Sequence, residues 1–229
     1  MNKPRLAALT LACLALAPTA WATDKEWTLN IKQESNGLTI HLGGNTTVGD
    51  PGRRIKGSGR VVEPQRALAP FSRVQVKGPV DVVLVQGERE EARVRADDNL
   101  EALVTTQVEG DTLTVALKPG ASFSTRTDLR VTVSFKQLQA LQLSSSGDAK
   151  LDRFKGEKLA LELNGSGDLR IGQLEVRELS AQLSGSGDLQ LAGSAERQDW
   201  SLSGSGDLAY AGRPVVKSRV SGSGELMGR

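Results

Sequence analysis

Hydrophobic and polar residues alternate along most of the second half of the chain. Apolar residues and glycines fill every second position over residues 159–171, and the same frame recurs over 179–191 and 200–210. A period of two residues predicts β-strands with one buried face. Serine and aspartate fall on the opposite parity, so we expect their side chains to face outward.

An internal repeat built on Gly-Ser-Gly-Asp lies within this frame. Its copies are SSSGDAKL (144–151), NGSGDLRI (164–171), SGSGDLQL (184–191), SGSGDLAY (203–210) and SGSGELMG (221–228). The acidic position recurs at spacings of 20, 20, 19 and 18 residues. A strand, a glycine bend and a second strand in about 20 residues predict one coil of a β-solenoid, because stacked copies build the continuous core that one copy cannot.

Looser versions of the frame precede the regular copies. Residues 74–84, VQVKGPVDVVL, place Gly-Pro-Val-Asp where later copies have Gly-Ser-Gly-Asp. Strand-like segments follow at 91–96, 102–108, 112–117 and 129–135, and no helix longer than a turn or two is expected. Residues 27–42 predict a separate hairpin that turns at Ser-Asn-Gly.

The N-terminal residues 1–22, MNKPRLAALTLACLALAPTAWA, have a basic start, an apolar run and a small-x-small end. This order predicts a secretory signal peptide cleaved after Ala22. The apolar run of about 12 residues is too short to span a bilayer, so no membrane span is expected. The alternative is a lipoprotein with a lipid attached to Cys13. A lipid-modified cysteine normally follows the apolar run, however, whereas Cys13 lies inside it.

These segments divide the chain into three parts. Residues 1–22 form the signal peptide, residues 23–54 an N-terminal extension with a β-hairpin and a glycine-rich linker, and residues 55–229 the repeat domain. Cleavage would leave 27 basic and 27 acidic residues and no cysteine. A neutral chain lacks the basic surface that nucleic acids require, so nucleic acid is excluded as a partner. One histidine and one cysteine in 229 residues exclude most catalytic schemes and transition-metal sites.

Several motifs occur in an order that resembles a known family. They are GSGRVVEPQRALAPFSRVQVKGPVDVVLVQGE (57–88), DNLEALVTTQVEGDTLTVALK (98–118) and the repeated SGSGD. Together they resemble the bacterial family described as "putative auto-transporter adhesin, head GIN domain", over about residues 55–229. The resemblance implies a right-handed parallel β-helix exported to the periplasm or outer surface, and it supplies no catalytic residues.

The outward positions of the repeats form two candidate ligand-facing rows. These are Ser146, Ser166, Ser186, Ser205 and Ser223, and Asp148, Asp168, Asp188, Asp207 and Glu225. Short polar side chains at tight bends commonly accept backbone N–H groups, and we favour this role for the aspartates. Calcium along the acidic row is the alternative, but the known calcium-binding repeat has nine residues, not about 20. No cofactor is expected.

The sequence therefore predicts a non-enzymatic, exported scaffold or adhesin-like protein that presents a flat Ser/Asp-lined face to a glycan or an envelope protein. One alternative is a glycosidase or lyase acting on polysaccharides, because a stacked acidic row supplies the carboxylate separations that glycosidases use. The other alternative is a purely structural envelope protein. The exposed strand edge of the last coil predicts self-association through that C-terminal coil.

Overall fold

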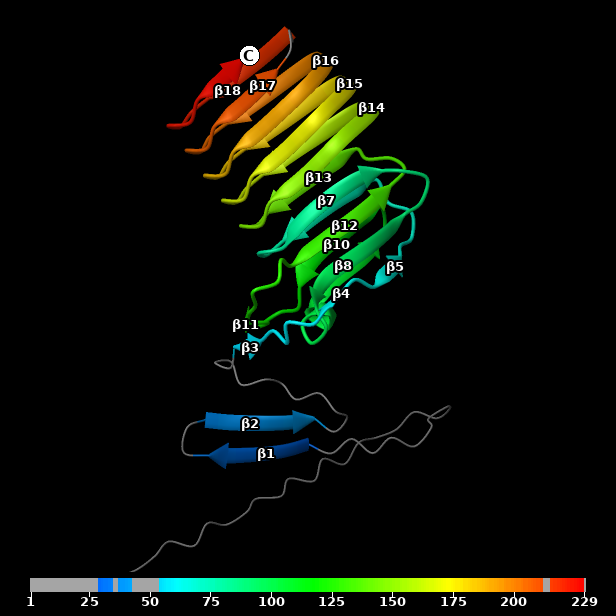
Figure 1. Ribbon diagram of the computed structural model, residues 1–229. Coiled ribbons are helices and arrows are strands. Elements are labelled where there is room, and N and C mark those ends of the chain that lie inside the picture. Colours follow the sequence, from blue (N-terminus) through cyan, green and yellow to red (C-terminus); the bar gives the residue numbers. More distant parts are fainter. Residues whose placement is uncertain (1–28, 35–36, 43–53, 212–214, 229) are drawn as a thin grey trace, which may run out of the picture. The chain divides into compact units, whose positions relative to one another are not determined.

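The computed structural model describes residues 29–34, 37–42, 54–211 and 215–228 (Figure 1). The chain divides into two units, Met1–Asp50 and Pro51–Arg229. The predicted signal peptide and its cleavage point lie outside the described residues. Within the described part, no helix has the length and hydrophobicity needed to cross a bilayer.

The first unit contains one antiparallel hairpin. It is formed by β1 (Leu29–Glu34) and β2 (Gly37–Leu42), with Leu29 opposite Leu42.

The described residues of the second unit lie mainly in strands, with one short 3₁₀ helix, η1 (Glu101–Leu103). Its strands are β3 (Ile55–Lys56), β4 (Val61–Val62), β5 (Gln65–Ala67), β6 (Arg73–Lys77), β7 (Asp81–Gln86), β8 (Glu91–Asp97), β9 (Val104–Glu109), β10 (Thr112–Leu117), β11 (Phe123–Ser124), β12 (Arg130–Phe135), β13 (Ala140–Ser144), β14 (Ala149–Leu163), β15 (Leu169–Leu183), β16 (Leu189–Leu202), β17 (Leu208–Ala211), β18 (Val215–Val220) and β19 (Leu226–Gly228). All except the pair β3 and β11 belong to a single sheet of 15 strands.

The first half of this sheet mixes parallel and antiparallel pairs. Strand β10 pairs parallel with β6 and antiparallel with β9, and β12 pairs parallel with β7 and antiparallel with β8. The chain reverses between β9 and β10 at Gly110, whose φ of 61° a side-chain-bearing residue rarely adopts. The prediction of a right-handed parallel β-helix is therefore wrong: the fold is all-β, with one curled, half-barrel sheet of mixed strand direction.

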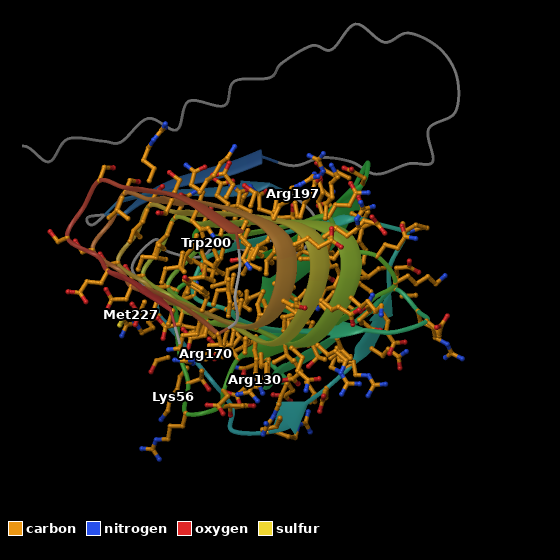
Figure 2. All side chains as sticks on the ribbon, turned by 90° about the horizontal axis from the view of Figure 1, so that it is seen from above. Lys56, Arg130, Arg170, Arg197, Trp200 and Met227 are labelled. Atoms are coloured by element: carbon orange, nitrogen blue, oxygen red, sulfur yellow. The ribbon has the colours of Figure 1, made fainter. Side chains whose placement is uncertain are left out.

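The second half of the sheet is parallel and in register. Leu159 of β14 pairs with Leu179 of β15, and Leu183 of β15 pairs with Leu202 of β16. The long strands bend so that their buried side chains, Trp200 among them, lie inside the curve (Figure 2). Successive leucines thus form continuous rows in the core, which is the packing that the two-residue period indicates.

The glycines of the repeat allow the turns to stack directly on one another. A Cβ atom on Gly185 would overlap the carbonyl oxygen of Gly165 in the preceding turn. The backbone N–H of Ser186 donates to that same carbonyl at 3.0 Å. Only a residue without a side chain leaves the two backbones this close, so the glycines fix the spacing of the turns.

Candidate functional site

The acidic row predicted from the repeat is aligned across successive turns. The backbone N–H of Asp168 donates to Oδ1 of Asp148 at 3.0 Å, and the N–H of Asp188 donates to Oδ1 of Asp168 at 3.0 Å. The same bond joins Asp207 to Asp188 and Glu225 to Asp207, each at 2.9 Å. Each aspartate side chain of the row therefore accepts a hydrogen bond from the turn that follows it.

This ladder begins in the looser repeats. The N–H of Asp148 donates to Oδ1 of Asp81 at 3.0 Å, so Asp81 occupies the position of the later aspartates, as the alignment of the motifs indicates. Carboxylates spaced ~4.8 Å apart repel by only about 0.9 kcal/mol per pair in water. Arg170 offsets part of this repulsion, because its guanidinium lies 2.8 Å from the carboxylate of Asp168. The aspartates thus stabilise the stacked turns.

The serine row lies beside this ladder on the surface. The five serines of the row are all exposed. Among the described residues, no three His, Cys, Asp or Glu side chains are grouped so that they could hold a metal ion. That the Ser/Asp rows face a ligand stays a prediction.

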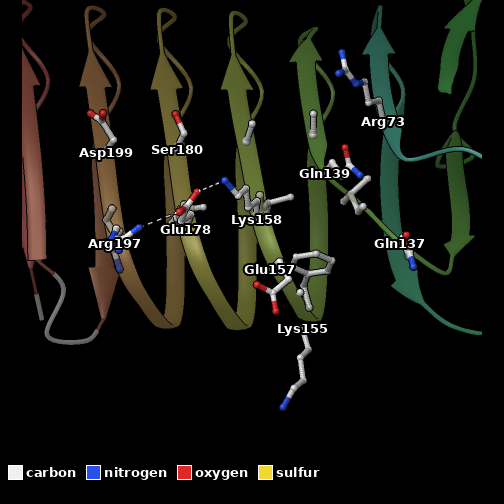
Figure 3. Close-up of a pocket in the computed structure, with 18 of the residues that line it drawn as sticks. Arg73, Gln137, Gln139, Lys155, Glu157, Lys158, Glu178, Ser180, Arg197 and Asp199 are labelled. Atoms are coloured by element: carbon white, nitrogen blue, oxygen red, sulfur yellow. Dashed lines mark hydrogen bonds and ion pairs between the residues drawn. The ribbon is translucent and has the colours of Figure 1, made fainter.

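A groove of about 1360 Å³ lies on the outer face of the stacked strands, away from the Ser/Asp rows (Figure 3). It opens where stacking against β14 is interrupted. Strand β7 pairs with β14 only up to Leu151, and β13 pairs with it only from Ala160 onward. Between these points β14 bends without a strand beside it on that side, and the bend forms part of the groove.

A side-chain amide takes the place of the missing strand. Nε2 of Gln86, the last residue of β7, donates to the carbonyl of Lys155 at 3.0 Å. The backbone N–H of Lys155 donates to Oε1 of Gln86 at 3.0 Å. The bend of β14 is therefore held by the same pair of hydrogen bonds that a neighbouring strand would make, while the space beside it stays open.

Short side chains form the floor of the groove. Ala140, Ala160 and Ser180 are in register across β13, β14 and β15, followed by Asp199 on β16. A second row, Lys158, Glu178 and Arg197, lies two residues earlier on the strands and forms a wall. The long side chains of the wall beside the short ones of the floor give the groove its depth.

The wall is an ion-paired row. Nζ of Lys158 lies 2.6 Å from Glu178, and Nη1 of Arg197 lies 3.1 Å from it (Figure 3). The hydrogen bond and the charge of Lys158, followed by the charge of Arg197, hold the pKa of Glu178 below its usual range. Glu178 is thus an ionised carboxylate that positions two cations along the groove.

Positive charge predominates among the residues that line the groove. The cationic residues are Arg73, Lys136, Lys155, Lys158, Arg197 and Lys217, and the acidic ones are Glu157, Glu178 and Asp199. The chain as a whole is nearly neutral. Three of these cations pair with acids beside the lining: Arg73 with Asp111, Lys136 with Glu90 and Lys155 with Glu175. The groove is therefore lined by paired charges of both signs, as the balanced composition of the chain would suggest.

A core residue behind the groove has one polar atom without a hydrogen-bond partner among the described residues. Gln198 is only 9% exposed and follows Leu159 and Leu179 in a row of the core. Its Oε1 atom, like the indole N–H of Trp200 two residues later, has no partner among the described residues. Unpaired buried polar atoms are rare in folded proteins, so this position needs an explanation.

Sequence reasoning missed the groove. Its location depends on where β7 ends and where β13 begins, and no motif marks those points. One signal was available: the frame puts a glutamine at 198, where the two preceding copies have Leu159 and Leu179. A polar residue in a core row is a local inconsistency of the kind that functional sites often carry.

A family model described as "Putative auto-transporter adhesin, head GIN domain" matches residues 70–227, more than half of the chain. The chain belongs to this family. The resemblance inferred from the ordered motifs is thereby confirmed. None of the curated proteins compared with this head GIN protein matches it.

Two of the solved structures that match the chain are described as a "putative adhesin" and a "putative lipid binding protein". A "putative adhesin" from Bacteroides fragilis has a TM-score of 0.64 and 17% identity, and the match covers 76% of this chain and 100% of that one. A "putative lipid binding protein" from Parabacteroides distasonis has a TM-score of 0.49 and 20% identity, covering 77% and 100%. At 17% identity the first match shows a shared fold alone.

Proposed function

We propose that this head GIN protein is a non-enzymatic, adhesin-like binding protein of the bacterial envelope. It is exported by a signal peptide cleaved after Ala22, and it binds its ligand in the groove over the bend of β14. The observation that carries this proposal is the groove itself, which is lined by exposed charged side chains held in register on stacked strands.

The groove suits binding because its side chains are held in place before a ligand arrives. Lys158, Glu178 and Arg197 sit on three consecutive in-register strands and are joined by ion pairs. A site that is already ordered loses little conformational entropy on association. The description of the family and of its structural relative as adhesins supports the same class of function.

The carboxylates of the groove argue against hydrolysis. A glycosidase needs one carboxyl group whose pKa is raised so that it can donate a proton. The pKa of Glu178 is lowered by Lys158 and Arg197. Glu157 lies 3.3 Å from the guanidinium of Arg177. The surroundings of Glu178 favour its charged form, which suits binding better than acid catalysis.

Blocking variants test which surface binds. The full chain is screened against a panel of envelope glycans and proteins, with binding and product release measured together. We expect binding without turnover. Replacement of Ala160 by tryptophan on the groove floor should weaken binding at least tenfold, whereas Ser186→Trp on the serine row should change it less than twofold. Ser180→Trp provides a second floor variant, and melting curves check that each variant folds.

Three results would contradict the proposal. Product release by the wild-type chain would show an enzyme. Loss of binding in Ser186→Trp with retention in both floor variants would move the site to the serine row. Absence of binding to every member of the panel would favour a purely structural envelope protein.

A further inference from the structure

We infer that the open edge of β18 binds an extended acidic segment of a partner protein as an added β-strand. This site goes beyond the proposed function, because it lies at the end of the sheet and not over the bend of β14. The inference draws on backbone groups that the preceding coils pair with each other and the last described coil leaves open, and on the charges beside them.

The carbonyl group that ends a long strand accepts a hydrogen bond from the coil that follows. The carbonyl oxygen of Leu183 accepts from the N–H of Ser203, and that of Leu202 accepts from the N–H of Ser221, each at 2.8 Å. Val220 of β18 is in register with Leu202. Its carbonyl therefore points to the side of β18 on which the described residues place no strand.

Alternate residues of β18 present their backbone groups to this open side. In a parallel sheet, both backbone groups of one residue point to the same neighbouring strand, and those of the next residue point the opposite way. Because the N–H of Ser221 bonds to β16, the backbone of Arg219 faces β16 too. The backbones of Ser218 and Val220 therefore face the open side, at the end of the stacked strands (Figure 1). Such a row is a template for an added strand.

The inward face of the last described coil is uncovered at the same edge. Leu183 and Leu202 occupy one core row in β15 and β16 and are 0% and 2% exposed. Val220 continues this row in β18 and is 48% exposed. An added strand would cover it with apolar side chains of its own, so the partner segment should have an apolar residue at every second position.

The outward face of β18 carries two cations. Lys217 and Arg219 are exposed, and neither forms an ion pair among the described residues. In β16, Asp199 is in register with Lys217 and Ser201 with Arg219. Acidic residues on an added strand would continue the alternation of sign that the groove wall shows over three strands. The remaining positions of the partner segment should therefore be acidic.

A second copy of this chain fits the edge less well. A two-fold pair of β18 strands is antiparallel, with outward side chains opposite each other. Centred on Ser218, the pairing places Lys217 of one copy opposite Arg219 of the other. Centred on either cation, it places that cation opposite its own equivalent. Like charges directly opposite each other destabilise a strand pair, so self-pairing is weak.

Binding of synthetic peptides to the full chain tests the inference. The probe is a blocked, fluorescently labelled peptide of alternating valine and glutamate, and its control has lysine in place of glutamate. We expect fluorescence polarisation at low ionic strength to show saturable binding of the acidic peptide and at least tenfold weaker binding of the basic one.

Backbone N-methylation of the acidic peptide tests strand pairing itself. The N–H groups of the valines lie on one edge of the extended peptide, and those of the glutamates lie on the other. Because only one edge can pair with β18, methylation at the valines and methylation at the glutamates should give affinities that differ at least tenfold. Equal affinities would show that the peptide does not bind as a strand.

Variants of the chain locate the site. Arg219→Glu should bind the acidic peptide at least tenfold more weakly than the wild type does and the basic peptide more tightly. Its matched control, Arg95→Glu, reverses an exposed charge on β8 and should change either affinity less than twofold. Ser218→Pro removes an N–H that faces the open side and puts the proline ring there. It should melt like the wild type and bind the acidic peptide at least tenfold more weakly.

Failure of this inference is distinguishable from failure of the proposed function. Absence of binding, or equal binding of the acidic and basic peptides, would overturn the inference and leave the groove untested by it. Tight dimers that the acidic peptide does not dissociate would assign the edge to a second copy instead. Lys217 also lies at the end of the groove, so Ala160→Trp is included. Peptide binding within twofold of the wild type supports the edge site, and its loss would move the peptide to the groove.

Discussion

The two halves of the large sheet use the same alternation of residues to build different pairings. Residues 54–135 form mixed pairs in which β8 and β9 run antiparallel to their neighbours. From β13 onward the strands are parallel and in register. In both halves every second side chain along a strand is buried, so the alternation alone does not set strand direction. Strand direction is set by the connections between strands. A hairpin reverses the chain at Gly110, whereas each stacked glycine turn leads into a strand parallel to the preceding one.

The largest effect should come from disturbing the stacked turns. In Gly185→Ala, the new Cβ would overlap the carbonyl of Gly165, and the backbone has no room to move without separating the turns. We expect a loss of about 3 kcal/mol or more in unfolding free energy, measured by denaturant titration. The exposed neighbour Ser186→Ala should change it by no more than about 0.5 kcal/mol. Equal effects of the two variants would show that close stacking does not fix the turns.

A smaller effect is expected from the acidic ladder. Asp188→Ala removes the acceptor for the N–H of Asp207 and should cost about 1–2 kcal/mol. Asp188→Asn keeps a carbonyl oxygen in the same place and should cost clearly less. Denaturant unfolding measures both. A loss in the asparagine variant as large as in the alanine variant would mean that the charge, rather than the hydrogen bond, holds the turn.

The mixed half should respond to acid through Asp97. This side chain is buried and accepts hydrogen bonds from the hydroxyls of Thr125 and Thr127, each at 2.6 Å. The bond from Thr125, then that from Thr127, lowers its pKa below 3.8. A depressed pKa contributes stability above pH 3.8, which is lost as the pH falls through the folded-state value.

Thermal melts between pH 6 and pH 2 measure this contribution. We expect Asp97→Asn to melt lower than the wild type at pH 6 and to lose less stability on acidification. Asp128→Asn, an exposed acid in the same half, is the control. Parallel pH curves for wild type and Asp97→Asn would show that Asp97 does not carry the acid sensitivity.

The smallest effect concerns self-association, which stays a prediction. Among the described strands, β18 and β19 each pair on one side only, and Val220 and Met227 are exposed beside them. Unpaired strand edges favour association of copies. We expect weak, concentration-dependent dimers in sedimentation experiments, reduced in Val220→Lys. A single monomeric species at high concentration would contradict this prediction.

The sequence predicted the regular half better than the mixed half. The glycine turns, the buried leucine rows and the alignment of the acidic side chains follow from a repeat in which each copy has the same neighbours. Residues 54–135 lack that regularity, and local patterns do not reveal that β8 pairs with β12 in the reverse direction. The groove was missed for the same reason, because it lies where the two halves meet and Gln86 replaces a strand.

Because each glycine turn contacts only the turns before and after it, the length of the protein is adjustable in steps of one copy. Inserting or deleting one unit of about 20 residues between 169 and 202 would preserve every neighbouring contact type, and it would lengthen or shorten the groove by ~4.8 Å. The reach of this surface could therefore change during evolution by duplication alone, without redesign of either end.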